Sequence, residues 1–434
     1  MQLKRERGTL RASLMTASCA LLGAQAAHAQ DADAGDTGGD WQSDSAILYY
    51  KEADGRVQAI EPVVSLRRDF GDEHILNLKL TYDSLSGGSP NGALPSNAPQ
   101  TFTTPSGAGG GGGEDDEGGG GRSTTYLVPG GALPLSKFQD QREAASLGWS
   151  QPFARLWKYN VGADVSHERD FMSAGINAAL SRDLFQRNTT LSIGSAFESD
   201  RIQPVGGAPE PGSDYALALR TSDQSKTVWS GLVGITQVMT RRWLVQFNVT
   251  ADRSSGYQTD PYKITSVLDA SGNLAGYYYE NRPRSRARQA AYLENRVALG
   301  RDTLALSLRY MKDDWGIRSQ TAELRYRLEF GNGAYLEPVG RYYHQTAADF
   351  YRLYLPAGDA VPTYFSADPR LAEFNAVTAG LKLAMPLGED REVALRVEYY
   401  RQTGRNVAAG FGSIAGLDLY PDLKATIAQV AVRF

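Results

Sequence analysis

The feature that most constrains this chain is a series of segments in which apolar and polar residues alternate. Within 74–83, one face carries Leu76, Leu78, Leu80 and Tyr82, whereas Asn77, Lys79, Thr81 and Asp83 fall on the other. A period of two indicates β-strands with one apolar face and one polar face. The same alternation recurs near 243–250, 304–310, 322–330 and 392–399. A soluble sandwich would bury the apolar faces, whereas a transmembrane barrel turns them to lipid and lines its lumen with the polar ones.

Three observations favour the barrel. The segments have the length that a tilted strand needs to cross a bilayer. Aromatic residues such as Trp149, Trp243 and Tyr310 lie near strand ends, as in the aromatic girdles of membrane barrels. The last segment, 427–434, alternates and ends in Phe434, which is typical of the terminal strand that directs assembly of bacterial outer-membrane barrels. We therefore predict an all-β fold, a transmembrane antiparallel β-barrel.

Short and long connections alternate along the chain, as expected for tight periplasmic turns and long external loops. We predict sixteen strands, with fourteen to eighteen as the defensible range, and a lumen wide enough for an aqueous channel. The predicted strands are 44–53, 56–68, 73–84, 140–151, 158–168, 171–182, 187–198, 226–239, 242–252, 282–299, 301–312, 315–330, 334–347, 371–385, 391–402 and 423–434.

Residues 1–29 have the three parts of a secretory signal peptide: a basic start, a short apolar middle, and Ala27-His28-Ala29 as a cleavage site. Cys19 raises the alternative of a lipoprotein, but no Leu precedes it in Thr16-Ala17-Ser18. Cleavage after Ala29 would remove the single Cys, and with it disulfides and thiol chemistry. The remaining domain, 30–434, is predicted to reside in the outer membrane of a Gram-negative bacterium.

Composition excludes several classes of protein. The mean hydropathy is −0.38, and no uninterrupted apolar stretch is long enough for a spanning helix. The formal charge is −4, which gives no basic field for a nucleic acid. Without the signal peptide, 41 basic and 48 acidic residues leave a net charge of −7.

Segment 85–139 is the longest predicted link. It contains a low-complexity run from Gly107 to Gly121, interrupted by Glu114-Asp115-Asp116-Glu117. Gly-rich acidic tracts stay flexible and solvated, so we expect a flexible external loop. Two alternatives remain open, a cation site at the four acids and flanks that fold inward as a constriction.

The sharpest chemical feature is a row of arginines at every second position where the chain enters a strand. With the neighbouring strands, the residues predicted to face the lumen or its mouth are Arg282, Arg284, Arg286, Arg288, Arg296, Arg309, Arg325 and Arg327. Guanidinium groups in a narrow passage attract anions and set selectivity. The alternative is that they neutralise lumen acids such as Glu294, Glu323, Glu329, Glu392 and Glu398 and brace a filled barrel.

Nothing in the sequence has the spacing of a metal site or a phosphate-binding loop, so we predict no cofactor. A hydrolase would need a base such as His167 beside Asp164 or Asp170, but Glu168 and Asp170 fit a solvated tight turn better. We therefore expect a protein that is not an enzyme.

Several motifs resemble a family of bacterial outer-membrane proteins catalogued as domain of unknown function 3570. They include 56–62, 82–90, 184–190, 254–263, Asp313-Asp314-Trp315-Gly316-Ile317 and 341–351, and the resemblance runs from about residue 40 to 434. The Gly-acid insert within 85–139 departs from the family pattern. The resemblance implies an exported barrel and no substrate, catalytic residue or cofactor. It also implies that the gene lies beside genes for small lipoproteins and for redox proteins of the envelope.

Together these observations predict a porin-like channel for small polar solutes, with anions favoured by the Arg row. The alternative is a non-conducting barrel that acts as a structural or docking partner of envelope proteins. Expected partners are outer-membrane lipid, the barrel assembly machinery acting through the C-terminal strand, and a periplasmic or lipoprotein component.

Overall fold

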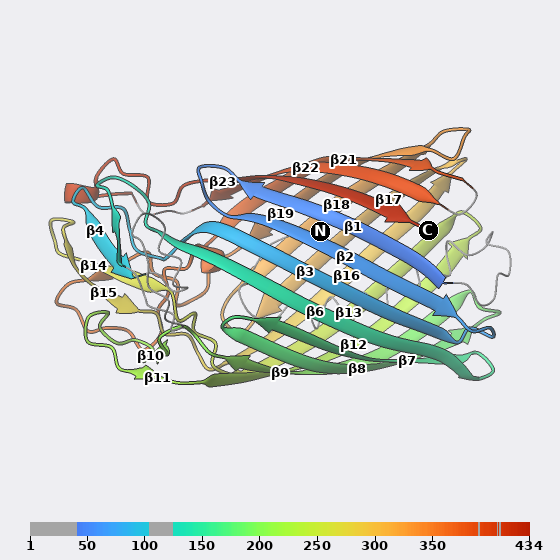
Figure 1. Cartoon of the computed structure of the whole chain (residues 1–434), viewed down its shortest axis with the longest axis horizontal. Helices are drawn as coiled ribbons and strands as arrows, with labels where there is room; N and C mark the ends of the chain where they lie inside the picture. Colours follow the sequence, from blue (N-terminus) through green and yellow to red (C-terminus); the bar gives the residue numbers. More distant parts are fainter. Residues whose placement is uncertain (1–40, 104–124, 389–390, 406, 408) are drawn as a thin grey trace, which may run out of the picture.

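A computed structural model describes residues 41–103, 125–388, 391–405, 407 and 409–434. The expected signal peptide and the Gly-acid run at 107–121 lie outside the described residues. Sixteen antiparallel strands close into one barrel in which β23 pairs with β1, so the predicted fold class and strand number are confirmed. Figure 1 shows the barrel as a long cylinder, with the smaller strands gathered at one end.

The barrel strands follow one another in chain order around the cylinder. The first eight are β1 (Trp41–Glu52), β2 (Gln58–Asp69), β3 (Ile75–Pro90), β6 (Leu135–Ala154), β7 (Trp157–Glu168), β8 (Phe171–Leu184), β9 (Thr189–Ile202) and β12 (Gln224–Thr240). The other eight are β13 (Trp243–Gly256), β16 (Ser285–Leu299), β17 (Asp302–Asp313), β18 (Arg318–Glu329), β19 (Tyr335–Gln345), β21 (Phe374–Pro386), β22 (Glu392–Gly404) and β23 (Leu423–Arg433).

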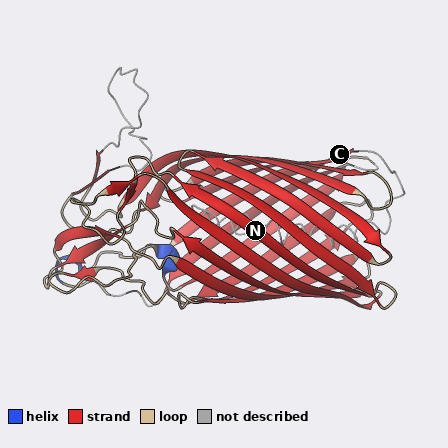
Figure 2. Cartoon of the chain, turned by 90° about the horizontal axis from the view of Figure 1, so that it is seen from below, coloured by secondary structure: helices blue, strands red, loops and turns tan. Residues whose placement is uncertain are grey.

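The two ends of the barrel differ, and Figure 2 shows the contrast. At the turn end, short connections such as 155–156 and 241–242 join neighbouring strands. At the loop end, the long connections carry short elements of their own. These are β4 (Gln100–Thr103), β5 (Thr125–Val128), β10 (Ala208–Pro209), β11 (Arg220–Thr221), β14 (Ile264–Leu268), β15 (Leu274–Tyr279), β20 (Leu355–Pro356), η1 (Pro369–Leu371) and η2 (Gly412–Ile414).

The longest link is shorter than the sequence indicated. We expected it to occupy 85–139, but β3 continues to Pro90 and β6 begins at Leu135. These two strands pair along their whole extension, from Leu85 opposite Asp140 to Pro90 opposite Leu135. The Gly and Ser residues of this stretch conceal the alternation, because backbone hydrogen bonds pair the two strands along the extension and few apolar side chains, such as Leu85 and Phe138, mark it.

Alternation along each strand separates two environments. The outward faces carry exposed apolar side chains, among them Ile47, Ile176, Ile193, Val233, Leu308, Leu324, Val377 and Leu395. Exposed apolar surface of this extent is stable only against another apolar phase, which for a closed barrel is lipid. Among the described residues, no helix is long and apolar enough to cross a membrane.

Candidate functional site

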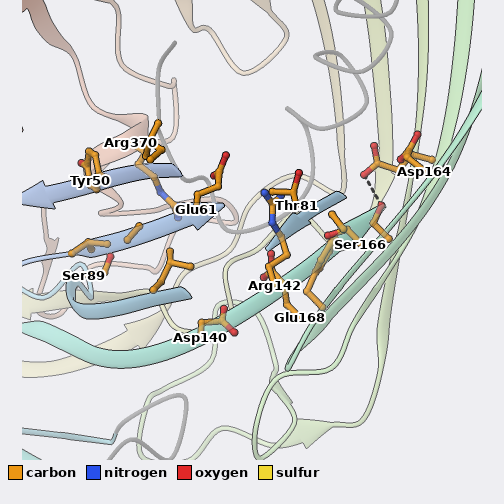
Figure 3. Close-up of a pocket in the computed structure, with 18 of the residues that line it drawn as sticks. Tyr50, Glu61, Thr81, Ser89, Asp140, Arg142, Asp164, Ser166, Glu168 and Arg370 are labelled. Atoms are coloured by element: carbon orange, nitrogen blue, oxygen red, sulfur yellow. Dashed lines mark hydrogen bonds between the residues drawn. The ribbon is translucent and has the colours of Figure 1, made fainter. Parts of the chain in front are cut away.

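The inward faces of the strands enclose a cavity of about 810 Å³, which we call the lumen cavity. Its wall comes from β1–β3, β6–β9 and β21–β23, and part of its lining comes from the loops. Figure 3 shows Tyr50 and Ser89 on one side, Asp164 and Ser166 on the other, and Arg142 between them. Because side chains alternate along β8, Ile176 points to the lipid and the next residue, Asn177, points into the cavity.

The lumen cavity follows the wall from one end of a strand to the other. Its lining includes Ile75 and Asn77 at the start of β3, and Ser89 and Pro90 at the end of that strand. A strand of 16 residues is about 50 Å long at roughly 3.3 Å per residue. The space inside the barrel therefore extends from the turn end to the loops.

Charged groups of both signs line this cavity. Seven lining residues are basic and nine are acidic. The basic residues are Arg56, Arg67, Lys79, Arg142, Lys158, Lys263 and Arg370, and the acidic ones are Asp44, Glu52, Glu61, Asp140, Asp164, Glu168, Glu198, Asp260 and Asp368. Several are held by partners, such as Arg142, whose Nε lies 2.5 Å from the Asp83 carboxylate. Acids slightly outnumber bases among these charged residues, and charged side chains on the wall suit a water-filled interior.

Two glycines make room for polar side chains on the β7–β8 part of this wall. Gly175 lies directly opposite Asp164, and a Cβ at Gly175 would come within 2.7 Å of that carboxylate. Likewise, a Cβ at Gly162 would meet the Asn177 amide at 2.9 Å. The two glycines thus let Asp164 and Asn177 lie flat against the wall.

Loops cover the loop end of the cavity. Gly92, Ala93 and Leu94 line it from the first long loop, which agrees with the alternative that the flanks of this segment fold inward. Two further loops, 257–284 and 346–373, contribute Asp260, Lys263 and 367–370, and we call these two loops the loop cap. The cap has a sheet of its own, in which β14 pairs with β15 and, in parallel, with β20.

A buried network of charges joins the two loops of the cap. Arg282 Nε lies 2.7 Å from Glu280 Oε1, and Arg282 Nη2 lies 2.7 Å from Asp368 Oδ2. Arg370 contacts the same Asp368 and reaches Asp260 Oδ2 at 2.9 Å. The side chains of Glu280 and Asp368 are 0 % and 1 % exposed.

This burial changes the acidity of both carboxylates. Burial raises the pKa of Glu280 above its usual value, and Arg282 opposes that change only in part. Burial would also raise the pKa of Asp368, but Arg370, Lys263 and Arg282 outweigh it and hold that pKa well below its usual range. Asp368 is therefore the anion that the three cations of the cap surround.

The predicted Arg row is divided between the cap and the barrel. Arg282 belongs to the cap network, and Arg284 precedes β16 as an exposed residue without an ion pair in the described part of the chain. Arg286 faces inward on β16, where it binds Asp313 and stacks on Trp315 at 4.5 Å. Arg288 follows it, 3.6 Å from Asp252.

The remaining four arginines of the prediction lie on β16–β18 in what we call the charge ladder. Glu294 binds Arg296 at 2.6 Å and Arg325 at 3.2 Å, and Arg327 binds Glu329 at 2.8 Å. Arg309 faces inward too, opposite Tyr292. None of the eight arginines is among the residues that line the lumen cavity. Their ion pairs are those of the bracing alternative, and their role in selectivity stays a prediction.

Phe434, the predicted assembly residue, closes the barrel seam. Its backbone N–H donates to Ser43 O at 2.8 Å and its carbonyl accepts from Ser43 N at 3.0 Å. The Phe434 ring is half exposed and lies 5.8 Å from the Arg391 guanidinium. Its recognition by an assembly machinery stays a prediction.

The first of the two pairs in the hydrolase alternative, His167 with Asp164, lacks the necessary geometry. Asp164 faces the lumen cavity, whereas His167, three residues later on β7, has the opposite parity and is exposed on the lipid side. Side chains three apart on a strand point to opposite faces. His167 and Asp164 therefore cannot act as a pair.

One acidic group was missed by the sequence reasoning. Oxygens of Asp140, Glu168 and Asp170 lie within 4.8 Å of one another, because pairing of β6 with β7 brings Asp140 to the β7–β8 turn. Asp170 also accepts a hydrogen bond from Tyr262 of the cap at 2.8 Å. Carboxylates suit Ca²⁺, but this ion takes about six to eight oxygens, so we assign no metal here.

The lumen wall of β6–β9 was also missed, although the alternation of 160–168 placed its members on one face. Ser, Asn and single Asp residues have no distinctive spacing, so sequence alone did not mark them as a site. The row of arginines was more conspicuous in the sequence, yet most of those arginines form ion pairs with acids of the barrel wall and the cap.

The fold and the lumen define a class of protein, the closed antiparallel β-barrels with an apolar outer face, which is the architecture of outer-membrane barrels. Within that class, the family model described as "Protein of unknown function (DUF3570)" matches residues 11–434, and the chain belongs to this family. The comparison with curated proteins gave no match.

Solved structures share the barrel fold at low identity. The Pseudomonas aeruginosa protein OccK2 (OpdF), solved in complex with glucuronate, is 11% identical, with 92% of this chain and 99% of that chain covered and a TM-score of 0.38. A bacterial polysaccharide outer membrane secretin is 9% identical over 92% and 100%, with a TM-score of 0.41. OccAB1 of Acinetobacter baumannii is 8% identical over 93% and 99%, with a TM-score of 0.36. At these values the likeness says nothing about solutes.

Proposed function

We propose that the chain forms a channel in the outer membrane that admits small polar solutes through the lumen cavity. The observation that carries the proposal is the extent of the cavity, which follows β3 from Ile75 to Pro90 and continues under the loops. A sixteen-stranded barrel is wide enough for a water-filled passage. Polar side chains such as Asn77, Asn160 and Ser173 on the wall would replace part of the hydration of a solute.

The charge preference follows from the groups that line the path. Nine acids against seven bases favour neutral or cationic solutes over anions. The Arg row predicted the opposite preference, but those arginines lie outside the lining and most are paired with acids. A salt gradient across a bilayer separates the two, because the sign of the reversal potential reports which ion passes more easily.

The test is single-channel conductance of the mature protein in a planar bilayer. A matched pair of variants ties any current to the cavity. Asn177→Trp adds bulk on the lumen side of β8, whereas Ile176→Trp adds the same bulk on the lipid side of the same strand. We expect Asn177→Trp to lower the conductance and Ile176→Trp to leave it unchanged. Silence from folded wild-type protein, or equal currents in both variants, would overturn the proposal.

A non-conducting barrel that docks envelope proteins is the second candidate, and the ion pairs favour it. The charge ladder braces β16–β18, and the buried network joins the cap loops over the lumen. Replacing Arg284, Arg286 and Arg288 with Gln separates the two candidates. A docking scaffold predicts lower heat resistance and no conductance in either form, whereas the channel predicts a current in both forms, with unchanged selectivity because these arginines lie outside the lining.

A further inference from the structure

Two cations lie side by side on the lipid-facing surface at the loop end of the barrel. Lys312 on β17 is directly opposite Arg318 on β18. Lys312 shares its face with Leu308 and Tyr310, which are exposed on the outside of the barrel. Arg318 shares the outward face of β18 with Leu324, and both cations are exposed. The pair therefore lies at the edge of the apolar band, next to the loops.

Like charges directly opposite each other on antiparallel strands destabilise the pair, because their Cβ atoms are only about 5 Å apart. In the part of the chain that the structure describes, neither Lys312 nor Arg318 has an ion pair. The acid of the adjoining turn, Asp314, accepts instead from the Ala287 backbone N–H at 2.9 Å. The exposed amides of Gln289, opposite Lys312, and Gln320, two residues along β18, adjoin the pair and add hydrogen-bond donors.

A second pair on the barrel shows how the protein itself neutralises this arrangement. Arg401 on β22 lies directly opposite Lys424 on β23, and both are exposed. There Asp422 binds Arg401 through two hydrogen bonds of 2.7 and 3.1 Å. The Lys312–Arg318 pair has the same cross-strand geometry but no such acid among the described residues, which leaves both charges available to an anionic partner.

We propose that Lys312 and Arg318 bind a phosphate group of a phosphorylated glycolipid in the outer leaflet of the outer membrane. The guanidinium fork of Arg318 matches two phosphate oxygens, and Lys312 adds a third, charged donor. Below the pair, Leu308 and Leu324 face the bilayer, where the acyl chains of the same lipid would lie. The site requires the loop end to face outwards, and it is independent of whether the lumen conducts.

The experiment measures binding of lipid A to the full-length mature protein in nanodiscs, by native mass spectrometry and by thermal unfolding. The test variant is the double substitution Lys312→Gln with Arg318→Gln. The control is Lys424→Gln, which removes a cation from the pair that already has an acid. Lipid A without its phosphates is the ligand control.

We expect the double variant to bind lipid A about tenfold or more weakly, since charged hydrogen bonds to phosphate are lost. Lys424→Gln should bind like the wild type, and removing the phosphates should abolish the difference between the wild type and the double variant. Added lipid A should raise the unfolding temperature of the wild type but not that of the double variant. The double variant should fold at least as stably without lipid, because the repulsion has gone. Equal binding of lipid A by wild type and double variant, or an equal difference with the dephosphorylated lipid, would overturn the proposal.

Discussion

The substitution Asp368→Asn tests whether the buried charge network holds the loop cap over the lumen. Asp368 is almost completely buried and contacts Arg282 and Arg370, which come from the two loops of the cap. Its Oδ1 also accepts from Arg370 N at 3.0 Å as the cap of η1, and an Asn side chain preserves that hydrogen bond. The substitution therefore keeps the cap of η1 but removes the charge, and it replaces Oδ2, which accepts from Arg282 and Arg370, with an amide group that cannot accept.

The expected loss follows from the partners left behind. Breaking a buried pair costs about 3–5 kcal/mol, because a charge stays buried without compensation. Here Arg282 keeps Glu280 and Arg370 keeps Asp260, so we expect the lower limit, about 3 kcal/mol. Such a loss corresponds to an opening of the cap more than about 100 times as frequent.

Hydrogen exchange on the folded protein in detergent measures this opening directly. Slowly exchanging amides of 257–284 and 346–373 should exchange faster in Asp368→Asn, while amides of the barrel strands keep their wild-type rates. Asp223→Asn is the matched control, because Asp223, in another loop, binds Arg201 of β9 in an exposed ion pair. Wild-type exchange in the cap of Asp368→Asn would refute the reasoning, and faster exchange throughout the barrel would show that the network stabilises more than the cap.

Three further predictions concern the ladder, a turn and acid. Glu294→Gln removes the buried acid that binds two arginines of the ladder, and urea unfolding in detergent should show a loss of about 3 kcal/mol. Glu329→Gln, in a more exposed pair, should change stability far less. Gly316→Ala should lower the unfolding temperature more than Gly300→Ala, although both have positive φ and share a backbone cost of about 1–2 kcal/mol. Only at Gly316 would the new Cβ meet a side chain, that of Asp349, and equal shifts would contradict this reason. Folding lowers the pKa of Asp368, so the cap of the wild type should be more stable than that of Asp368→Asn by the full amount above about pH 4, and by less as the pH falls further. Hydrogen exchange, corrected for its intrinsic pH dependence, measures this difference. A difference that grows in acid would contradict the sign.

The sequence by itself determined the fold, because alternation acts on every strand separately. A residue such as Leu308 or Arg309 is assigned to lipid or lumen by its parity alone, without knowledge of its neighbours. Counting the alternating segments gave the sixteen strands, and the structure has the same number. Alternation also placed Arg286, Arg288 and Arg296 on the inward face, where the structure has them.

Only the tertiary structure decided which inward residues line the cavity and which contact each other. Closure of the barrel brings Glu294 to Arg325 and Asp140 to Glu168, and folding of the loops brings Asp368 to Arg282. These contacts depend on strand register and loop path, which local patterns do not encode. The arginines that stand out in the sequence are therefore paired within the wall and the cap. The lining of the cavity belongs instead to inconspicuous residues such as Asn177, because a cavity is formed by the space between strands that are distant in the sequence.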